Sequence, residues 1–73
     1  MKYLVNYFDE DKIEREHIFE AERIDVDLGN VIMEWVDNSF GVDSQTDGTD
    51  VWYENEDGEQ IIVMEIINIS EID

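Results

Sequence analysis

Apolar and polar residues alternate with a period of two over the first part of the chain. The segment KYLVNYF at 2–8 is rich in β-branched and aromatic residues, and the polar turn DEDK follows it. In the next segment, Ile13, Phe19 and Ala21 share one side while glutamates occupy most of the other. These patterns predict an antiparallel pair of strands at about 2–8 and 13–23.

The spacing then changes to that of an amphipathic helix at about 25–39. The apolar positions at i, i+3, i+4 and i+7 are Leu28, Val31, Ile32 and Trp35. Asp25 or Asp27 can cap the start of this helix, and Gly41 lies just past its end. The pattern therefore predicts one helix that buries a single apolar stripe.

Two more strands are predicted after an acidic loop at 41–49. They are DVWYEN at about 50–55 and a long apolar run at about 60–69, and the pair Asp57-Gly58 between them is a strong turn signal. The expected fold class is α+β, with 1–73 forming a single small domain. In the order ββαββ, the one helix packs on one face of a four-stranded antiparallel sheet.

The first and last strands are apolar on both sides, whereas a half-solvated antiparallel strand should alternate apolar with polar residues. One helix covers only one face of the sheet, so the second face needs another cover. We consider three covers: a homodimer through the uncovered sheet face, a partner protein, or a curled sheet with Trp52 folded over it.

The chain has no motif that indicates catalysis. Without cysteine there is no disulfide, no thiolate zinc site and no thiol nucleophile. The single histidine, His17, lies in a strand pattern, and the serines and glycines form no nucleophile motif or phosphate loop. We therefore expect a protein that is not an enzyme and uses no cofactor.

The N-terminal segment and the hydropathy pattern indicate a cytoplasmic protein. MKYLVNYFDED has a short apolar run that is ended by acids, so it lacks the core and cleavage site of a secretory signal. No stretch approaches the roughly 20 apolar residues that span a membrane. If the chain is phage-encoded, the expected compartment is the cytoplasm of the host cell.

The net charge of -17 is the most unusual property of the sequence, and it is unevenly distributed. All four basic side chains lie within residues 1–24, and the remaining 49 residues hold 14 acids and no base. With 42% hydrophobic residues the chain should still fold, because charge-driven disorder also needs low hydrophobicity. The charge thus belongs to a folded surface, where it also favours solubility.

The acidic loop can also be interpreted as a metal-binding site. From Asp43 the EF-hand template places a turn glycine and a twelfth-position carboxylate in register. The ligands of this Ca²⁺ alternative would be Asp43, Gln45, Asp47, Thr49 and Glu54. Gln45 is a poor ligand there, and a predicted strand replaces the second helix of an EF-hand. The principal expectation is therefore that the chain has no metal site.

The acids are better explained as a surface that another molecule reads as a polyanion. The candidate partner-binding residues in and around the loop are Asp43, Asp47, Asp50, Glu54, Glu56, Asp57 and Glu59, with Trp52 as an aromatic anchor. Supporting acids on the helix and second strand are Asp27, Glu34, Asp37, Glu16 and Glu20. Alternate strand residues are about 6.6 Å apart, about twice the phosphate spacing of about 3.4 Å per DNA strand. Carboxylates that alternate along a strand and also line a helix can together approximate the charge density of a phosphate row.

Small, cysteine-free, strongly acidic chains with a small sheet and a helix resemble the phage-encoded DNA-mimic inhibitors, including anti-CRISPR and anti-restriction proteins. The resemblance covers size, composition and the acidic stretch at 41–60. It implies a stoichiometric inhibitor that occupies the basic DNA-binding site of a bacterial defence or DNA-processing enzyme. Such a protein binds no nucleic acid directly and no membrane.

Two other classes remain open. An acidic immunity protein or nuclease inhibitor would also meet a basic enzyme surface, but it need not have the shape of DNA. A small Ca²⁺-binding module would use the loop at 43–54. The expected partner in the first reading is a basic nucleic-acid-binding protein, such as a CRISPR effector or a restriction enzyme.

Overall fold

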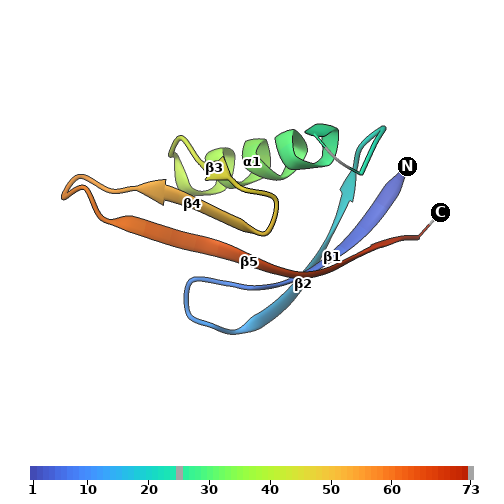
Figure 1. Ribbon diagram of the computed structural model, residues 1–73, viewed down its shortest axis with the longest axis horizontal. Helices are drawn as coiled ribbons and strands as arrows, with labels where there is room; N and C mark the ends of the chain where they lie inside the picture. Colours follow the sequence, from blue (N-terminus) through green and yellow to red (C-terminus); the bar gives the residue numbers. More distant parts are fainter. Residues whose placement is uncertain (25, 73) are drawn as a thin grey trace.

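A five-stranded antiparallel sheet carries one helix on one face in the computed structural model, which describes residues 1–24 and 26–72 (Figure 1). The elements in chain order are β1 (Lys2–Phe8), β2 (Glu14–Glu20), α1 (Val26–Phe40), β3 (Gln45–Thr46), β4 (Asp50–Glu54) and β5 (Gln60–Glu71). The chain is therefore a small α+β domain with the order ββαβββ.

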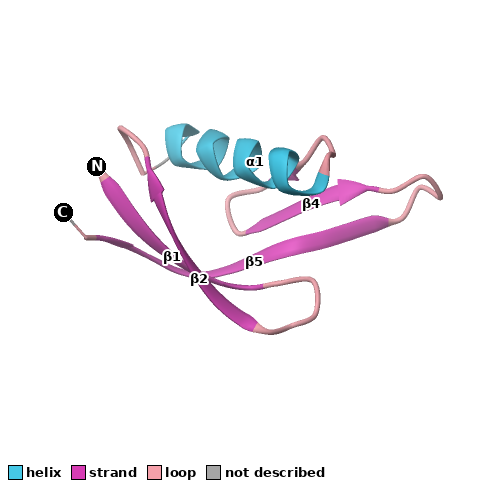
Figure 2. Ribbon diagram, turned by 180° about the vertical axis from the view of Figure 1, so that it is seen from behind, coloured by secondary structure: helices cyan, strands magenta, loops and turns pink. Residues whose placement is uncertain are grey.

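The long strand β5 holds the two halves of the sheet together. The strand order is β2-β1-β5-β4-β3, so the first and last strands of the chain are neighbours at the centre. From Gln60 to Glu65, β5 pairs with β4, and from Glu65 to Glu71 it pairs with β1 on its other edge. The two hairpins consequently extend in different directions from β5, and the chain ends lie near each other (Figure 2).

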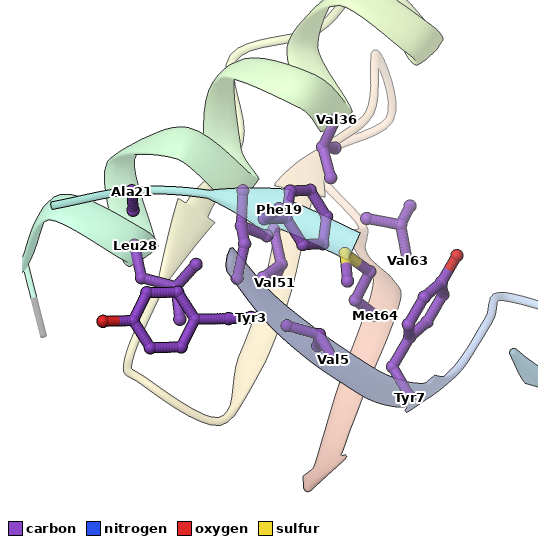
Figure 3. Close-up of a cluster of buried hydrophobic side chains, with 11 residues drawn as sticks. Tyr3, Val5, Tyr7, Phe19, Ala21, Leu28, Val36, Val51, Val63 and Met64 are labelled. Atoms are coloured by element: carbon purple, nitrogen blue, oxygen red, sulfur yellow. The ribbon is translucent and has the colours of Figure 1, made fainter. Parts of the chain in front are cut away.

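The core lies between α1 and the concave side of the sheet. Its helical part consists of Leu28, Ile32 and Val36, which are the i, i+4 and i+8 positions of one stripe. The strands contribute Tyr3, Val5, Tyr7, Phe19, Ala21, Val51, Val63 and Met64 (Figure 3). Burial of this one face explains why Phe19 and Ala21 are buried while Glu20 between them is exposed.

Two irregularities in strand pairing interrupt the alternation of buried and exposed residues along β5. Opposite Val51 and Trp52 the register shifts so that Val63 is an extra residue, and Val63 and Met64 are both buried. A second shift opposite Asn6 and Tyr7 leaves Ile67 as an extra residue that is 49% exposed. Bulges of this kind bend a strand and increase its twist, which lets one strand serve both hairpins.

The prediction of four strands was wrong in one detail, because the loop at 41–49 contains the short strand β3. Gln45 and Thr46 pair with Trp52 and Val51 of β4. The hydroxyl of Thr46 donates to the Asp50 carbonyl and accepts from the Gly48 N–H, which closes the turn. A two-residue strand held by a local side chain has no hydrophobic period, so the pattern of the sequence could not reveal it.

The helix ends where its glycine predicted. Gly41 has φ of 69° and its N–H donates to the Asp37 carbonyl, which is a left-handed C-terminal cap. At the other end, the predicted cap Asp25 lies outside the described residues, and Asp27 lies in the first turn. At 15 residues α1 is short, and within 1–24 and 26–72 no helix is long and apolar enough to cross a membrane.

Replacing Gly29 by alanine should stabilise the protein by about 1 kcal/mol, because Gly29 lies within α1 and alanine is the better helix former. An added Cβ would meet Thr46 Cγ2 at 3.9 Å, which is an ordinary contact. The midpoint of urea unfolding measures the change. Gly41→Ala is the control, and it should destabilise because its φ of 69° strains a side chain. A loss of stability in Gly29→Ala would contradict the packing around that position.

Candidate functional site: an acidic surface around two pockets

The turn between β4 and β5 presents a group of exposed acids from an ordered scaffold. The side-chain oxygen of Asn55 accepts hydrogen bonds from the N–H groups of Asp57 at 3.0 Å and Glu59 at 2.9 Å. Gly58, with φ of 79°, completes the turn. This group, which we call the acidic tip, consists of Glu54, Glu56, Asp57 and Glu59, all of which are exposed.

Two of the predicted acids serve the local structure. Asp47 Oδ1 accepts hydrogen bonds from the N–H groups of Asp50 and Thr49 and from the Thr49 hydroxyl, and these donors lower the pKa of Asp47. Asp37 Oδ1 accepts from the Ser44 N–H at 2.7 Å, which ties the loop to α1. Asp43 is exposed and Asp50 is half-buried. The carboxylates of this loop therefore differ in how freely a partner could reach them.

The supporting acids lie on opposite sides of the molecule. In the register of β1 and β2, Glu16 faces Asn6 and Glu20 faces Lys2, on the face of the sheet away from α1. The acids of the helical stripe, Asp27, Glu34 and Asp37, lie on the helix that covers the other face. The predicted partner-binding residues therefore separate into the acidic tip, the loop with the helix, and the second strand.

The two adjacent aromatic residues of β4 point to opposite faces, as strand geometry requires. Tyr53 packs against the core on the helix side, with its ring 6.5 Å from that of Phe40. Trp52 lies on the uncovered face, half-buried and paired in register with Ile62. Trp52 is thus the member of the pair that is open to a partner.

The face away from the helix mixes apolar and acidic side chains. Ile18 and Ile62 are 53% and 38% exposed there. The glutamates of β2 and Glu65 of β5 share this face, because Phe8 pairs in register with both Glu14 and Glu65. No described element forms a second layer over it, within residues 1–24 and 26–72. A second copy placed on this face would bring like charges together.

Two of the four Lys and Arg side chains, Lys12 and Arg15, lie at the turn between β1 and β2. Arg15 Nε donates to Asp9 Oδ2 at 2.9 Å, and Lys12 Nζ lies 3.6 Å from Glu65 Oε2. The N–H of Ile13 and the guanidinium of Arg15, as donors, lower the pKa of Asp9. With 21 Asp and Glu against four Lys and Arg, the acidic side chains outnumber the basic ones by 17, wherever the cations lie.

The proposed EF-hand ligands do not converge. Gln45 lies in β3 and pairs with Trp52, while the turn donors already occupy one oxygen of Asp47. Glu54 is the last residue of β4 and belongs to the acidic tip. In the part of the chain that the structure describes, no three His, Cys, Asp or Glu residues are arranged to hold a metal ion. The hairpin formed by β3 and β4 replaces the metal-binding loop.

His17 belongs to an aromatic cluster under the helix. Its ring stacks on Trp35 at 4.5 Å and lies 4.7 Å from Phe19. Trp35 also meets Tyr7 edge-on at 6.4 Å. These contacts give His17 a packing role that joins β2 to α1.

Among residues 1–24 and 26–72, two pockets lie beside β5 beneath the helix, and no pattern in the sequence predicted them. The first, of about 450 Å³, is largely apolar, and Leu28, Gly29 and Ile69 are among its walls. The second, of about 330 Å³, is lined by Tyr7, Asp9, Glu10, Arg15, Trp35, Ser39, Phe40, Val63 and Met64. These residues come from four separate segments, so no local spacing could have indicated the second pocket.

Comparison with known proteins adds no relative from which a role could be transferred. No protein-family model matches the chain, and neither a curated protein nor a solved structure does. A function is therefore inferred from the charge and geometry described above.

Proposed function

We propose that this protein is a stoichiometric inhibitor that carries the negative charge of a nucleic acid and occupies the basic DNA-binding site of a bacterial defence or DNA-processing enzyme. The carboxylates act as substitutes for phosphates. Binding is driven by screened Coulomb attraction and by counterions released from the two surfaces. The protein itself performs no catalysis in this proposal.

The observation that carries the proposal is the charge per unit length. The long axis of the molecule measures 41 Å. Duplex DNA carries one charge per about 1.7 Å of axis, so a duplex of that length holds about 24 negative charges. The net charge of -17 is about 0.7 of that value. The acids lie on both sheet faces and at the tip, so a single basic cleft would contact only one group of them.

The acidic tip is the group best suited to enter a basic cleft. It projects at the end of the β4–β5 hairpin, away from the hairpin of β1 and β2 that contains Lys12 and Arg15 (Figure 1). Asn55 orders the backbone of the turn that carries these charges. A charge on an ordered backbone loses less conformational entropy on binding than a charge on a flexible tail.

Competition with DNA tests the proposal. A fluorescent duplex is bound to each of several basic bacterial DNA-binding enzymes, and the protein is titrated against it. We expect one protein per site to displace the duplex. The affinity of the protein for the enzyme should fall on the order of 10-fold or more between about 50 and 200 mM salt. The combined variant E54Q/E56Q/D57N/E59Q should displace the duplex on the order of 10-fold less well.

The matched control is E14Q/E16Q/E20Q/E22Q, which removes the same number of charges from β2 and its end. Unchanged displacement by this control assigns the contact to the acidic tip, and an equal loss in both variants assigns it to total charge. Inhibition of a single enzyme with no effect of salt would instead favour a cognate immunity protein. Failure to displace DNA from any enzyme of the panel would contradict mimicry.

A further inference from the structure

Strand β5 leaves half of one edge unpaired. On that edge β1 pairs only from Glu65 onward, and no other described strand pairs with Gln60–Met64 there. The N–H of Asn55 donates to the Glu59 carbonyl, so Glu59 points its backbone groups toward β4. Because backbone groups alternate along an antiparallel ladder, Gln60 and Ile62 direct their N–H and C=O groups to the open edge.

The pocket of about 330 Å³ lies beside this open edge, between β5 and the C-terminal part of α1. Val63 and Met64 form its β5 side, and Trp35, Ser39 and Phe40 form its helix side. Phe40 is 43% exposed, so its ring is accessible from outside. An extended segment that paired with β5 would therefore pass directly over an aromatic pocket.

The charges around the pocket favour a cationic occupant. The acidic tip lies at one end of the open edge, and Glu10 lines the pocket at the other. Arg15, the cation that lines the pocket, is already held by Asp9 at 2.9 Å. A second copy of this chain would add another 17 negative charges, so a basic partner fits the site better.

We propose that the open edge of β5 and this pocket together bind an extended, basic segment of a partner protein. The segment adds a strand at Gln60–Ile62 and inserts one arginine or lysine side chain into the pocket. This proposal rests on the proposed function, from which it takes the positive charge of the partner. It adds the place where the partner docks and the form of the segment that docks there.

The chemistry of the pocket matches a long cationic side chain. The aliphatic stem of arginine or lysine packs on apolar surface while its charged end stays near water, and the rings of Phe40 and Tyr7 provide that surface. The charged end then reaches the carboxylate of Glu10. Main-chain hydrogen bonds provide affinity in strand addition, and alternate side chains in pockets provide specificity.

The probe is a blocked eight-residue peptide in which valine and arginine alternate, titrated into the isotope-labelled protein and followed by NMR and calorimetry. The comparison peptide alternates glycine and arginine, so it has equal charge but poor strand propensity. We expect the valine peptide to bind at least about 10-fold more tightly, because strand addition contributes beyond charge. Its chemical-shift changes should centre on Gln60–Met64 and on Phe40.

Two pairs of variants test the edge and the pocket separately. Ser39→Lys places a cation in the pocket, while Asn38→Lys makes the same charge change on an exposed position outside it. Ile62→Pro removes the outward N–H at a position where an edge tolerates proline, while Ile62→Thr keeps it. We expect Ser39→Lys and Ile62→Pro to weaken the valine peptide about 10-fold or more, and the two controls to change affinity less than about 3-fold. Thermal unfolding confirms that each variant is folded.

Equal affinity for both peptides, with no effect of Ser39→Lys, would overturn the proposed docking site. The inhibitor proposal would then be tested by the DNA competition experiment alone. Peptide binding at β5 without displacement of DNA from any enzyme would support the docking site and contradict the inhibitor proposal. Shift changes centred on the uncovered face near Trp52 would also overturn the docking site. So would pairing of β5 with a second copy, detected as a dimer by sedimentation.

Discussion

Met64→Ala should lower the free energy of unfolding by about 2–5 kcal/mol, the usual cost of truncating a large buried side chain. Met64 is 1% exposed and lies where β5 passes from β4 to β1, so both hairpins pack around it. A domain of this size rarely has more than about 3–5 kcal/mol of stability. We therefore expect the variant to be largely unfolded at 25 °C.

The matched control for this change is Ile62→Ala, two residues earlier on the same strand. Ile62 is 38% exposed on the uncovered face, so its truncation should cost about 1 kcal/mol or less. Urea titration followed by circular dichroism measures both variants. Similar losses in the two variants would mean that the uncovered face is a second core, contrary to the burial described above.

Trp35→Ala should cost about 3–5 kcal/mol, because the indole joins the helix to the first hairpin. Its ring stacks on His17 and meets Phe19 and Tyr7 edge-on, at 5.3 and 6.4 Å. These rings belong to β1 and β2, whereas the tryptophan belongs to α1. Loss of the indole removes these ring contacts between α1 and the first hairpin.

Trp52→Ala is the comparison for this second change. Both tryptophans are half-buried, but among the described residues only Trp35 has ring contacts, so truncation of Trp52 should cost less than half as much. Thermal unfolding measures both variants, and a Trp52→Phe background allows Trp35 fluorescence to report alone. An equal or larger loss from Trp52→Ala would show that the tryptophan of β4 holds the sheet together.

The helix and the long strands could be predicted because the spacing of their apolar residues is regular over a short stretch of sequence. The alternation around Phe19 and Ala21 predicts a strand with a core face, and both residues are buried. The helical stripe at Leu28, Ile32 and Val36 is buried in the same way. The structure ends β2 at Glu20, before the predicted boundary at 23, because alternation continues past the last residue that pairs with β1.

The sequence pattern did not show why the first and last strands are apolar on both sides. From this apolar character we expected that the second face of the sheet needs a cover. In the structure these strands are the central neighbours β1 and β5, and the bulge at Val63 turns two consecutive residues of β5 into the core. Strand order and bulges depend on long-range pairing, which a local period does not encode.

The candidate site was predictable in composition but not in arrangement. The acids at 41–60 form a conspicuous group in sequence, yet Asp47 orders a turn while Glu56 and Asp57 project from the tip. A pattern cannot distinguish an acid that accepts backbone hydrogen bonds from one that stays free. The pocket beside β5 was missed because its lining is assembled from both hairpins and the helix.

The pairing of Tyr3 with Glu71 has a consequence for how the chain reaches its native state. Contacts between such distant residues slow folding, because a large loop must close before they form. During that delay the apolar strand β1 has one unpaired edge, the kind of surface that recruits other chains into aggregates. Mutual repulsion among nascent chains opposes this association, so we expect the same carboxylates to limit aggregation while the chain folds.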